Sequence, residues 1–487
     1  MEIRRRGKKP LLLILVVAVI AVLTFFLVAF ITKTGIFKVY GKVYYDESLS
    51  ESEISELEAI FTNELKLECD VTVSAMDKLE VPTVDNEILV SIKVPITDFY
   101  NPIDNIEVRA ADELLVSEYG LIDFEELDFS KKLLKINDKY FLDDFVAGAV
   151  FRVIKFQSEA FEEEIAPLVE GLALNSRPEA DNTLTFAQTG VTALSRGMHK
   201  KLNAVGNGAY FAEGIGEFLS DFDLTHTSNE SSFSSYASSS NICSDDRFMD
   251  TLIAIGLDIV ELTGNHNQDC GDEDARRTID MYNEKNIRIV GGGKTLEEAR
   301  KPLKISEKGN KITMLAYNQS TGGQTYDTTP GANPYNEENA ASEIAAAKTR
   351  GDTVIVDVQY NECIFYDTAS EDTTCDAADS AAGDQVGLFR HLIDLGADVV
   401  VGTSAHQPQT YELYGDGEIF YGLGNIFFDQ VWWPGTTRSL ILVHYFYNNK
   451  LVQTRIFPTV YDENMQTELM NRETSEWFLN RLVNARP

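Results

Sequence analysis

The chain has few cysteines and lacks the short motifs that mark several common classes of enzyme. No two of its five cysteines form a CxxC pair, which argues against a structural zinc site. The sequence contains neither a GxSxG motif nor a P-loop, so two frequent hydrolase signatures are absent. It also shows no internal repeat. Its 487 residues are enough for two to four domains.

Basic residues are scarce. The chain has 42 Lys and Arg against 77 Asp and Glu, a formal net charge of −35. Five of the basic residues lie within the first nine positions, so the remainder is more acidic still. This balance argues against nucleic acid as a ligand. It also predicts that a polyanionic partner is repelled unless cations screen or bridge the charges.

The first 31 residues differ in kind from the rest. A basic tail, 1–10, precedes an uncharged segment, 11–31, whose length as a helix matches the roughly 30 Å of a bilayer core. This pattern predicts a transmembrane helix with its N-terminus in the cytoplasm and the main body outside the cell. A cleaved signal peptide is the alternative, but Phe30-Ile31-Thr32-Lys33 is a poor cleavage site.

An extracellular location would allow disulfides to persist. Cys363 and Cys375 flank one polar loop and are the first candidate pair. Cys243 with Cys270 is the second, which would leave Cys69 unpaired.

The rest of the chain divides into two regions. Residues 32–174 predict a small α/β domain, and the polar stretch 175–182 predicts a linker. Within the first region we expect a helix near 54–65, a strand at 88–96 that is broken at Pro95, and a helix over 158–172.

Residues 183–460 alternate apolar strands with helical segments, which predicts a largely parallel sheet covered by helices. Strands are expected at 184–188, 223–227, 258–263, 287–290, 312–317, 353–358 and 398–401. Helices are expected near 210–219, 245–255, 273–285, 337–349 and 384–395. Three closing strands at 419–421, 439–446 and 451–457 are expected to be antiparallel, and 461–487 form a partly helical tail.

Polar side chains follow several of the predicted strands directly. If the strands are parallel, their carboxyl ends meet at one edge of the sheet, where α/β proteins place their chemistry. That edge would gather a carboxylate, two imidazoles and several amides. The residues concerned are Asn229, Glu230, Asn265, His266, Gln359, Glu362 and His406.

Each of these residues also has a purely structural interpretation. Gly264-Asn265 is typical of a turn because both residues tolerate positive φ. His406 fits a hydrogen-bonded structural histidine, and Glu230 fits a solvated carboxylate. The tract Gly291-Gly-Gly293 fits either a phosphate site before a helix or a tight turn, and the turn is the simpler explanation. The coincidence of several such groups at strand ends favours function.

The region 183–460 resembles the bacterial capsule-synthesis protein CapA family, which is tied to poly-γ-glutamate capsules and related to calcineurin-like metallophosphatases. The matching stretches appear in family order: 228–233, 262–266, 291–293, 398–402, 405–409 and 421–430. Residues from about 88 to 174 are similar, more weakly, to part of a solute-binding fold. The resemblance implies an α/β fold, a metallophosphatase-like sheet sandwich flanked by helices.

The resemblance also implies roles for individual residues. Glu230, Asn265 and His406 would hold metal, with Glu230 bridging two ions. His266 would protonate a leaving group. Residues that would contact substrate are Asn229, Gln359, Glu362, Gln407 and Asn425.

Three expected metal ligands are absent. A Gly-Asp motif is replaced by Gly190-Val191, the position of a later histidine is Gln359, and the first imidazole of a His-x-His pair is Ser404. Since carboxylate and imidazole are the strong ligands, the remaining set would hold at most one divalent ion, Mn²⁺ or Zn²⁺, with water completing it.

Three functions are compatible with the resemblance, one of them a binding module that keeps the pocket for ligand recognition only. The other two are more specific. The first is a membrane-anchored, weakly catalytic or non-enzymatic component that helps synthesise, export or anchor a capsule polymer. Its partners would be capsule-synthesis membrane proteins and an anionic polymer held through cations. The second is a surface metal-dependent phosphoesterase or amide hydrolase with His266 as general acid.

Overall fold

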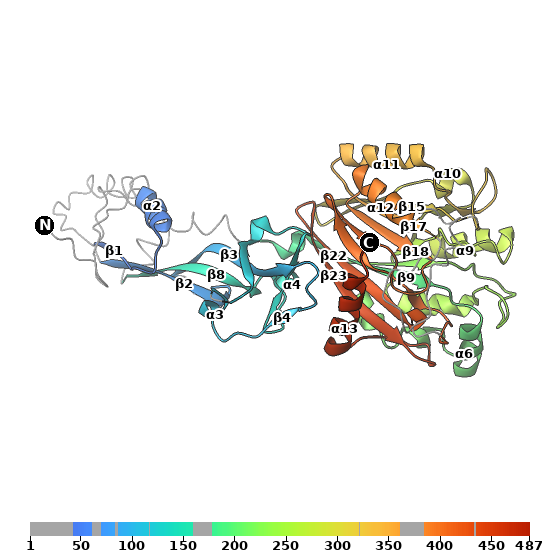
Figure 1. Cartoon of the computed structure of the whole chain (residues 1–487), viewed down its shortest axis with the longest axis horizontal. Coiled ribbons are helices and arrows are strands. Elements are labelled where there is room, and N and C mark those ends of the chain that lie inside the picture. Colours follow the sequence, from blue (N-terminus) through green and yellow to red (C-terminus); the bar gives the residue numbers. More distant parts are fainter. Residues whose placement is uncertain are drawn as a thin grey trace, which may run out of the picture. The chain divides into compact units, whose positions relative to one another are not determined.

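The computed structural model describes residues 42–60, 70–82, 86–115, 117–158, 178–320, 322–360, 384–432 and 435–487 (Figure 1). The chain divides into two units. The first comprises Met1–Thr97, Asp104–Leu127 and Leu133–Ala180, and the second comprises Asp98–Ile103, Asp128–Lys132 and Asp181–Pro487. Within the described ranges, no helix has both the length and the apolar character needed to cross a bilayer. The predicted transmembrane segment, 11–31, lies outside those ranges.

The first unit is built on a sheet with the strand order β1-β2-β8-β3-β5. Its first pair is parallel and its other pairs are antiparallel. The strands are β1 (Val43–Tyr45), β2 (Val71–Glu80), β3 (Glu87–Asp98), β5 (Gly120–Asp123) and β8 (Ala147–Gln157). Shorter elements are α2 (Glu51–Ile60), β4 (Asn105–Ile106), α3 (Ala111–Leu115), β6 (Lys131–Leu133), β7 (Lys135–Ile136) and α4 (Phe141–Asp144).

The predicted break at Pro95 is wrong, because β3 continues through it. Strand β8 pairs with β3 only as far as Lys93, so the N–H that Pro95 lacks has no partner to lose in β8. The carbonyl of Pro95 still accepts from the backbone N–H of Leu134 at 2.9 Å. A missing donor costs little at such a position. The helix predicted over 158–172 lies outside the described residues except for Ser158.

The second unit contains two large sheets. The first has the order β12-β11-β10-β9-β22-β23-β24, with β21 also paired to β9. Its strands are β9 (Thr183–Thr192), β10 (Leu224–Asn229), β11 (Ile259–Glu261), β12 (Arg288–Val290), β21 (Asn425–Phe427), β22 (Arg438–Tyr447), β23 (Lys450–Tyr461) and β24 (Thr467–Leu469). Strands β9 to β12 are mutually parallel, whereas β22 to β24 are antiparallel to their neighbours.

The second sheet has the order β14-β15-β17-β18-β20-β19. Its strands are β14 (Leu303–Glu307), β15 (Asn310–Asn318), β17 (Thr353–Gln359), β18 (Val399–Thr403), β19 (Tyr411–Tyr414) and β20 (Gly417–Phe420). The four inner strands are parallel. The expectation that the strand at 419–421 is antiparallel is therefore wrong for its pairing with β18.

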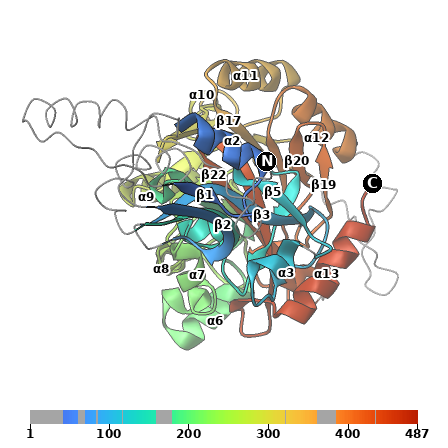
Figure 2. The same cartoon turned by 90° about the vertical axis from the view of Figure 1, so that its left-hand side faces the viewer.

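The two sheets pack face to face around one apolar core. Leu184, Leu224 and Ile259 of the first sheet share this core with Ile312, Ile355 and Val399 of the second. Helices α11 (Glu337–Thr349) and α12 (Gln385–Asp394) cover the outer face of the second sheet. Helix α7 (Gly216–Ser220) contacts β10, and α9 (Asp272–Glu284) contacts β12. Helices α6 (Gly197–Val205), α7 and α8 (Met249–Ala254) lie at one side of this unit, and α11 and α12 at the other (Figure 2).

The prediction of a mixed α/β fold is confirmed. Most expected strands are present, but they are distributed over two sheets. Elements that the sequence did not predict include α6, β14, β19, β21, β24 and the two-stranded pair β13 (Gly292–Gly293) and β16 (Gly331–Ala332). The second unit also contains the helices α10 (Leu296–Ala299) and α13 (Arg472–Asn484).

One predicted disulfide is present. Cys243 and Cys270 are bonded, so the second candidate pair is confirmed. Cys69, Cys363 and Cys375 lie outside the described residues.

Candidate functional site

The interior between the two sheets changes character along the parallel strands. At the amino ends, inward positions carry apolar side chains such as Leu184, Leu224 and Ile355. Two to six residues further along the same strands and at their ends, the inward positions become polar while staying buried. These polar residues are Gln188, His226, Ser228, Glu230, Glu261, Asp357, Gln359 and Thr403. The polar groups predicted at the sheet edge, here called the rim, are therefore the outer end of a polar region that extends between the two sheets.

Glu230, Asn265 and Gln359 come together at that rim. The Gln359 side-chain amide donates from Nε2 to Glu230 Oε1 at 3.4 Å and to Asn265 Oδ1 at 3.3 Å. Its Oε1 accepts from Thr403 Oγ1 at 3.2 Å. Glu230, Gln359 and Thr403 are buried. We call these four residues the rim cluster. It joins the ends of four strands that are far apart in the sequence.

The orientation of the Gln359 amide follows from this network. An amide carries its donors on nitrogen and its acceptor on oxygen. The opposite orientation would turn Oε1 toward two acceptor oxygens and leave Thr403 facing an NH₂ group. The arrangement in the structure matches every donor with an acceptor, which is how amide orientations are assigned.

Gly264 lets the Asn265 corner approach Glu230 closely. A Cβ atom at Gly264 would lie 2.6 Å from the Cα atom of Glu230. Neither Gly264 nor Asn265 has a positive φ. The predicted turn is present, since Asn267 N–H donates to the carbonyl of Gly264 at 3.5 Å, but it does not use positive φ. The glycine is needed for close packing against the end of β10.

His266 points to a different partner. Its Nδ1 lies 2.7 Å from Asp269 Oδ2, and about a third of its side chain is exposed. A carboxylate at one ring nitrogen fixes the orientation of an imidazole. The Cys243–Cys270 disulfide ties the residue after Asp269 to the segment between β10 and α8, so this corner is held covalently as well.

His406 is oriented by Asn425. The Asn425 amide donates from Nδ2 to Gln430 Oε1 at 3.1 Å and to the carbonyl of Thr436 at 3.0 Å, so its Oδ1 is the acceptor. His406 Nδ1 lies 2.9 Å from that oxygen and must therefore donate. Neutral His406 then carries its lone pair on Nε2, the arrangement found in metal-binding histidines with a fixed tautomer.

The other predicted substrate residues are placed as follows. Asn229 is buried and donates to the carbonyl of Ser231 at 2.9 Å and to the Tyr282 hydroxyl at 2.7 Å. Its side chain is therefore committed to packing against α9 and does not join the rim cluster. Gln407 is buried next to His406. Glu362 lies outside the described residues.

Sequence reasoning missed the polar residues beneath the rim. Asp357 Oδ1 accepts from Gln188 Nε2 at 2.6 Å, and Asp357 Oδ2 lies 3.2 Å from His226 Nε2 without the alignment of a hydrogen bond. His444 Nε2 donates to Gln188 Oε1 at 3.2 Å. The signal was present in the sequence, since His226, Ser228 and Glu230 are spaced by two along one strand and its end.

Two glutamates of this interior are held neutral by burial. Burial, followed by the neighbouring charge of Asp357, raises the pKa of Glu261 to about 8. Burial also raises the pKa of Glu418 to about 8 and lowers that of His444 to about 3. The Thr454 hydroxyl lies 2.5 Å from Glu418 Oε2 and 2.9 Å from His444 Nδ1. The Thr454 hydroxyl has one proton, so it can donate to only one of these two partners. When Glu418 is protonated it can donate to the hydroxyl oxygen, and the hydroxyl can then donate to the neutral His444.

These residues do not fit a two-metal centre. Position 191 is a valine, position 359 is an amide that presents its donors, and position 404 is a serine. Within the described ranges, no three His, Cys, Asp or Glu side chains are grouped so that they would hold a metal ion. The donor hydrogens of Gln359, which face Glu230 and Asn265, are the specific obstacle.

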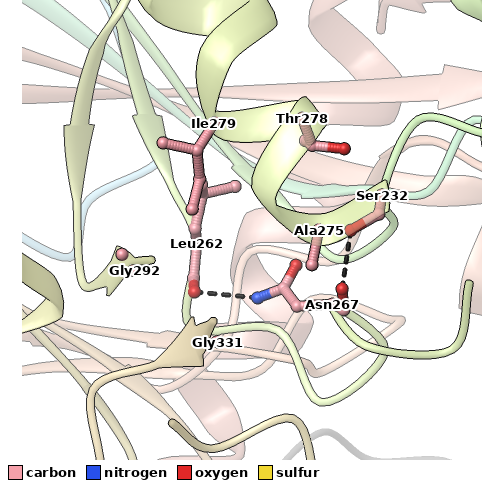
Figure 3. Close-up of a pocket in the computed structure, with 9 residues that line it drawn as sticks. Ser232, Leu262, Asn267, Ala275, Thr278, Ile279, Gly292 and Gly331 are labelled. Atoms are coloured by element: carbon pink, nitrogen blue, oxygen red, sulfur yellow. Dashed lines mark hydrogen bonds between the residues drawn. The ribbon is translucent and has the colours of Figure 1, made fainter. Parts of the chain in front are cut away.

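A small cavity lies between β11 and α9 (Figure 3). The Ser232 hydroxyl donates to the carbonyl of Asn267 at 2.6 Å, and Asn267 Nδ2 donates to the carbonyl of Leu262 at 2.8 Å. The residues that line it are Ser232, Leu262, Asn267, Ala275, Thr278, Ile279, Gly292, Gly293 and Gly331. No predicted site residue is among them, so the cavity is distinct from the rim cluster.

The glycine tract 291–293 is explained by packing. Gly291 has φ +73°, and Gly292 pairs with Ala332. A Cβ atom at Gly292 would lie 2.5 Å from the Cβ atom of Leu262. Helix α10, which follows, has only four residues. These contacts favour the turn over the phosphate site.

Fold and site together define a mixed α/β protein whose polar side chains gather at the carboxyl ends of parallel strands. Residues 185–430, half of the 487-residue chain, match the family described as bacterial capsule synthesis protein PGA_cap. The chain belongs to this family, which confirms the resemblance.

Two curated relatives carry related names. The capsule biosynthesis protein CapA of Bacillus anthracis is 26% identical over 195 residues, 39% of this chain and 44% of that protein. The PGA biosynthesis protein CapA of Bacillus subtilis is 30% identical over 190 residues, 38% of this chain and 46% of that protein. The chain thus spans about half the length of the relatives it matches.

Among solved structures, TT1561 of Thermus thermophilus aligns with 55% of this chain and 100% of its own. The identity is 10% and the TM-score is 0.29, too weak a similarity to assign a fold.

Proposed function

We propose that this protein takes part in the synthesis, export or anchoring of an extracellular capsule polymer of the poly-γ-glutamate type. The observation that carries the proposal is the match of residues 185–430 to the capsule synthesis family, a range that includes all four residues of the rim cluster. The names of the two CapA relatives support the same polymer class.

The finer parts of the proposal rest on the sequence. Residues 11–31 would anchor the chain in the cell membrane, with residues 1–10 in the cytoplasm and the body outside. The fold would be of the metallophosphatase type with a reduced site. Capsule-synthesis membrane proteins would be its partners. A net charge of −35 requires divalent cations between this surface and an anionic polymer.

A complementation experiment tests the proposal. The gene is deleted in its host and restored as wild type, as Asn265→Ala or as Glu338→Gln, and cell-bound and released polyglutamate are measured. We expect Asn265→Ala to lose most of the cell-bound polymer. Glu338→Gln, an exposed change on α11, should match the wild type. A deletion strain with normal capsule would overturn the proposal.

A surface hydrolase is the second candidate, favoured by the His266–Asp269 contact at 2.7 Å. An imidazole paired in this way and partly exposed is suited to donate a proton to a leaving group. Hydrolysis of a generic phosphodiester by the purified chain, lost in His266→Ala, would support it. If turnover is absent in the presence of Mn²⁺ and of Zn²⁺, this candidate is excluded.

A further inference from the structure

Two acceptor oxygens from separate strands of the first sheet face one nitrogen atom of the second sheet. Glu230 Oε1 follows β10, Asn265 Oδ1 follows β11, and Gln359 Nε2 lies at the end of β17. The two distances, 3.4 and 3.3 Å, are nearly equal. Both are longer than the roughly 2.9 Å of a strong N–H···O bond. The nitrogen therefore lies between the oxygens without being closely bound to either.

A carboxylate oxygen and an amide oxygen that converge on one point are what a hard divalent cation binds. Such ions sit about 2.0–2.6 Å from their oxygen ligands, so they need the space between converging oxygens to be clear. In this chain that space faces an NH₂ group with partial positive charge. The group satisfies the same oxygens by hydrogen bonds.

The backbone and Thr403 hold Gln359 in this position. Its strand is paired on both sides, with Asn318 opposite it in β15 and Thr403 in β18. The Thr403 hydroxyl donates to Gln359 Oε1, and the Glu230 carboxylate, which only accepts, faces the NH₂ end of the amide. Reversing the amide to offer its oxygen to a cation would place that oxygen against the carboxylate oxygen of Glu230.

We propose that Gln359 is a built-in occupant of the cation position, and that it makes the rim cluster independent of divalent metal. The inference goes beyond the capsule role, because it concerns the chemistry of the cluster and would hold whatever polymer the protein handles. It also gives a physical reason for the missing ligands. Once a side-chain donor occupies the position between Glu230 and Asn265, a metal-binding residue at position 191 or 404 has no ion to coordinate.

Metal binding to the purified full chain tests this directly. Wild type, Gln359→Glu and Gln319→Glu are titrated separately with Mn²⁺ and with Zn²⁺, and bound metal is measured by calorimetry and by metal analysis after dialysis. Gln359→Glu removes the NH₂ group and supplies a second carboxylate at nearly the same volume. Gln319→Glu is the matched control, since it adds the same charge at an exposed position directly after the neighbouring strand β15, where the Gln319 N–H donates to the carbonyl of Gln359.

We expect wild type and Gln319→Glu to retain no metal, and Gln359→Glu to bind one equivalent at least about tenfold more tightly, because it replaces a donor with a strong ligand. Thermal melts of all three check that each is folded. Stoichiometric metal in the wild type would overturn the proposal. So would a folded Gln359→Glu that binds no better than Gln319→Glu. Because the readout is metal occupancy, its outcome is separate from that of the capsule experiment.

Discussion

The two ends of the inter-sheet core are equally buried but chemically opposite. Along β17 the inward side chains are Ile355, Asp357 and Gln359, and all three are fully buried. The amino end is a hydrocarbon core of the kind that stabilises any sheet sandwich. The carboxyl end contains carboxyls, imidazoles and amides whose burial is costly unless they are paired. The comparison indicates that the polar end is kept for a purpose other than stability.

The largest expected effect contrasts the two ends on one strand. Ile355→Ala should cost about 2–5 kcal/mol of unfolding free energy, because it leaves a cavity in the apolar core. Gln359→Ala should cost less, about 1–3 kcal/mol, since it removes long hydrogen bonds but leaves the buried Glu230 and Thr403 oxygens without this partner. Urea unfolding of both variants measures the difference. Equal losses would mean that the polar end is as structural as the apolar one.

The next effect concerns the loops outside the core. Replacing both Cys243 and Cys270 by serine should cost about 3 kcal/mol, because the bond closes a loop with a sequence separation of 27. The melting temperature of the double variant should fall and should respond less to reductant than that of the wild type. If wild type melts identically with and without reductant, the disulfide does not hold the His266 corner.

A smaller, pH-dependent effect comes from Glu418. Its folded pKa of about 8 lies above the ordinary value of 4.5, so the folded state keeps its proton while the unfolded state loses it. Stability should therefore fall as pH rises from about 4.5 to 8, by on the order of 1 kcal/mol per pH unit for this group. Glu418→Gln should reduce that slope, and Glu261 should maintain a similar slope of its own.

Unfolding curves between pH 5 and pH 8 provide the check. A Glu418→Gln variant with an unchanged slope would show that this carboxyl is ionised in the folded protein. His444 acts in the opposite direction: its pKa of about 3 means that its contribution is lost as pH falls from about 6.5 toward 3.

Much of the fold could be predicted from the sequence, because buried parallel strands are uninterrupted apolar runs. The segments that became β15, β17 and β18 contain such runs, whereas β10 is mostly polar. The division of the strands into two sheets could not be predicted, since an apolar strand does not specify its neighbour. The break predicted at Pro95 was wrong because a strand can continue through a proline where no neighbouring strand needs its N–H. Here β8 stops pairing with β3 at Lys93, which the sequence alone does not show.

The candidate site could be predicted in part. The positions of Glu230 and Asn265 follow from the rule that parallel strands present their carboxyl ends together. The role of Gln359 could not be foreseen, because it depends on partners 129 and 94 residues away and on the hydroxyl of Thr403. Asn229 was assigned to substrate because the sequence did not show that it faces Tyr282.

Anomalous diffraction from crystals of the wild-type chain grown with Mn²⁺ tests the central claim most directly. We expect no anomalous peak at the rim cluster, and density for the Gln359 side-chain amide between Glu230 and Asn265. A manganese peak within about 2.6 Å of Glu230 Oε1 and Asn265 Oδ1 would contradict the account.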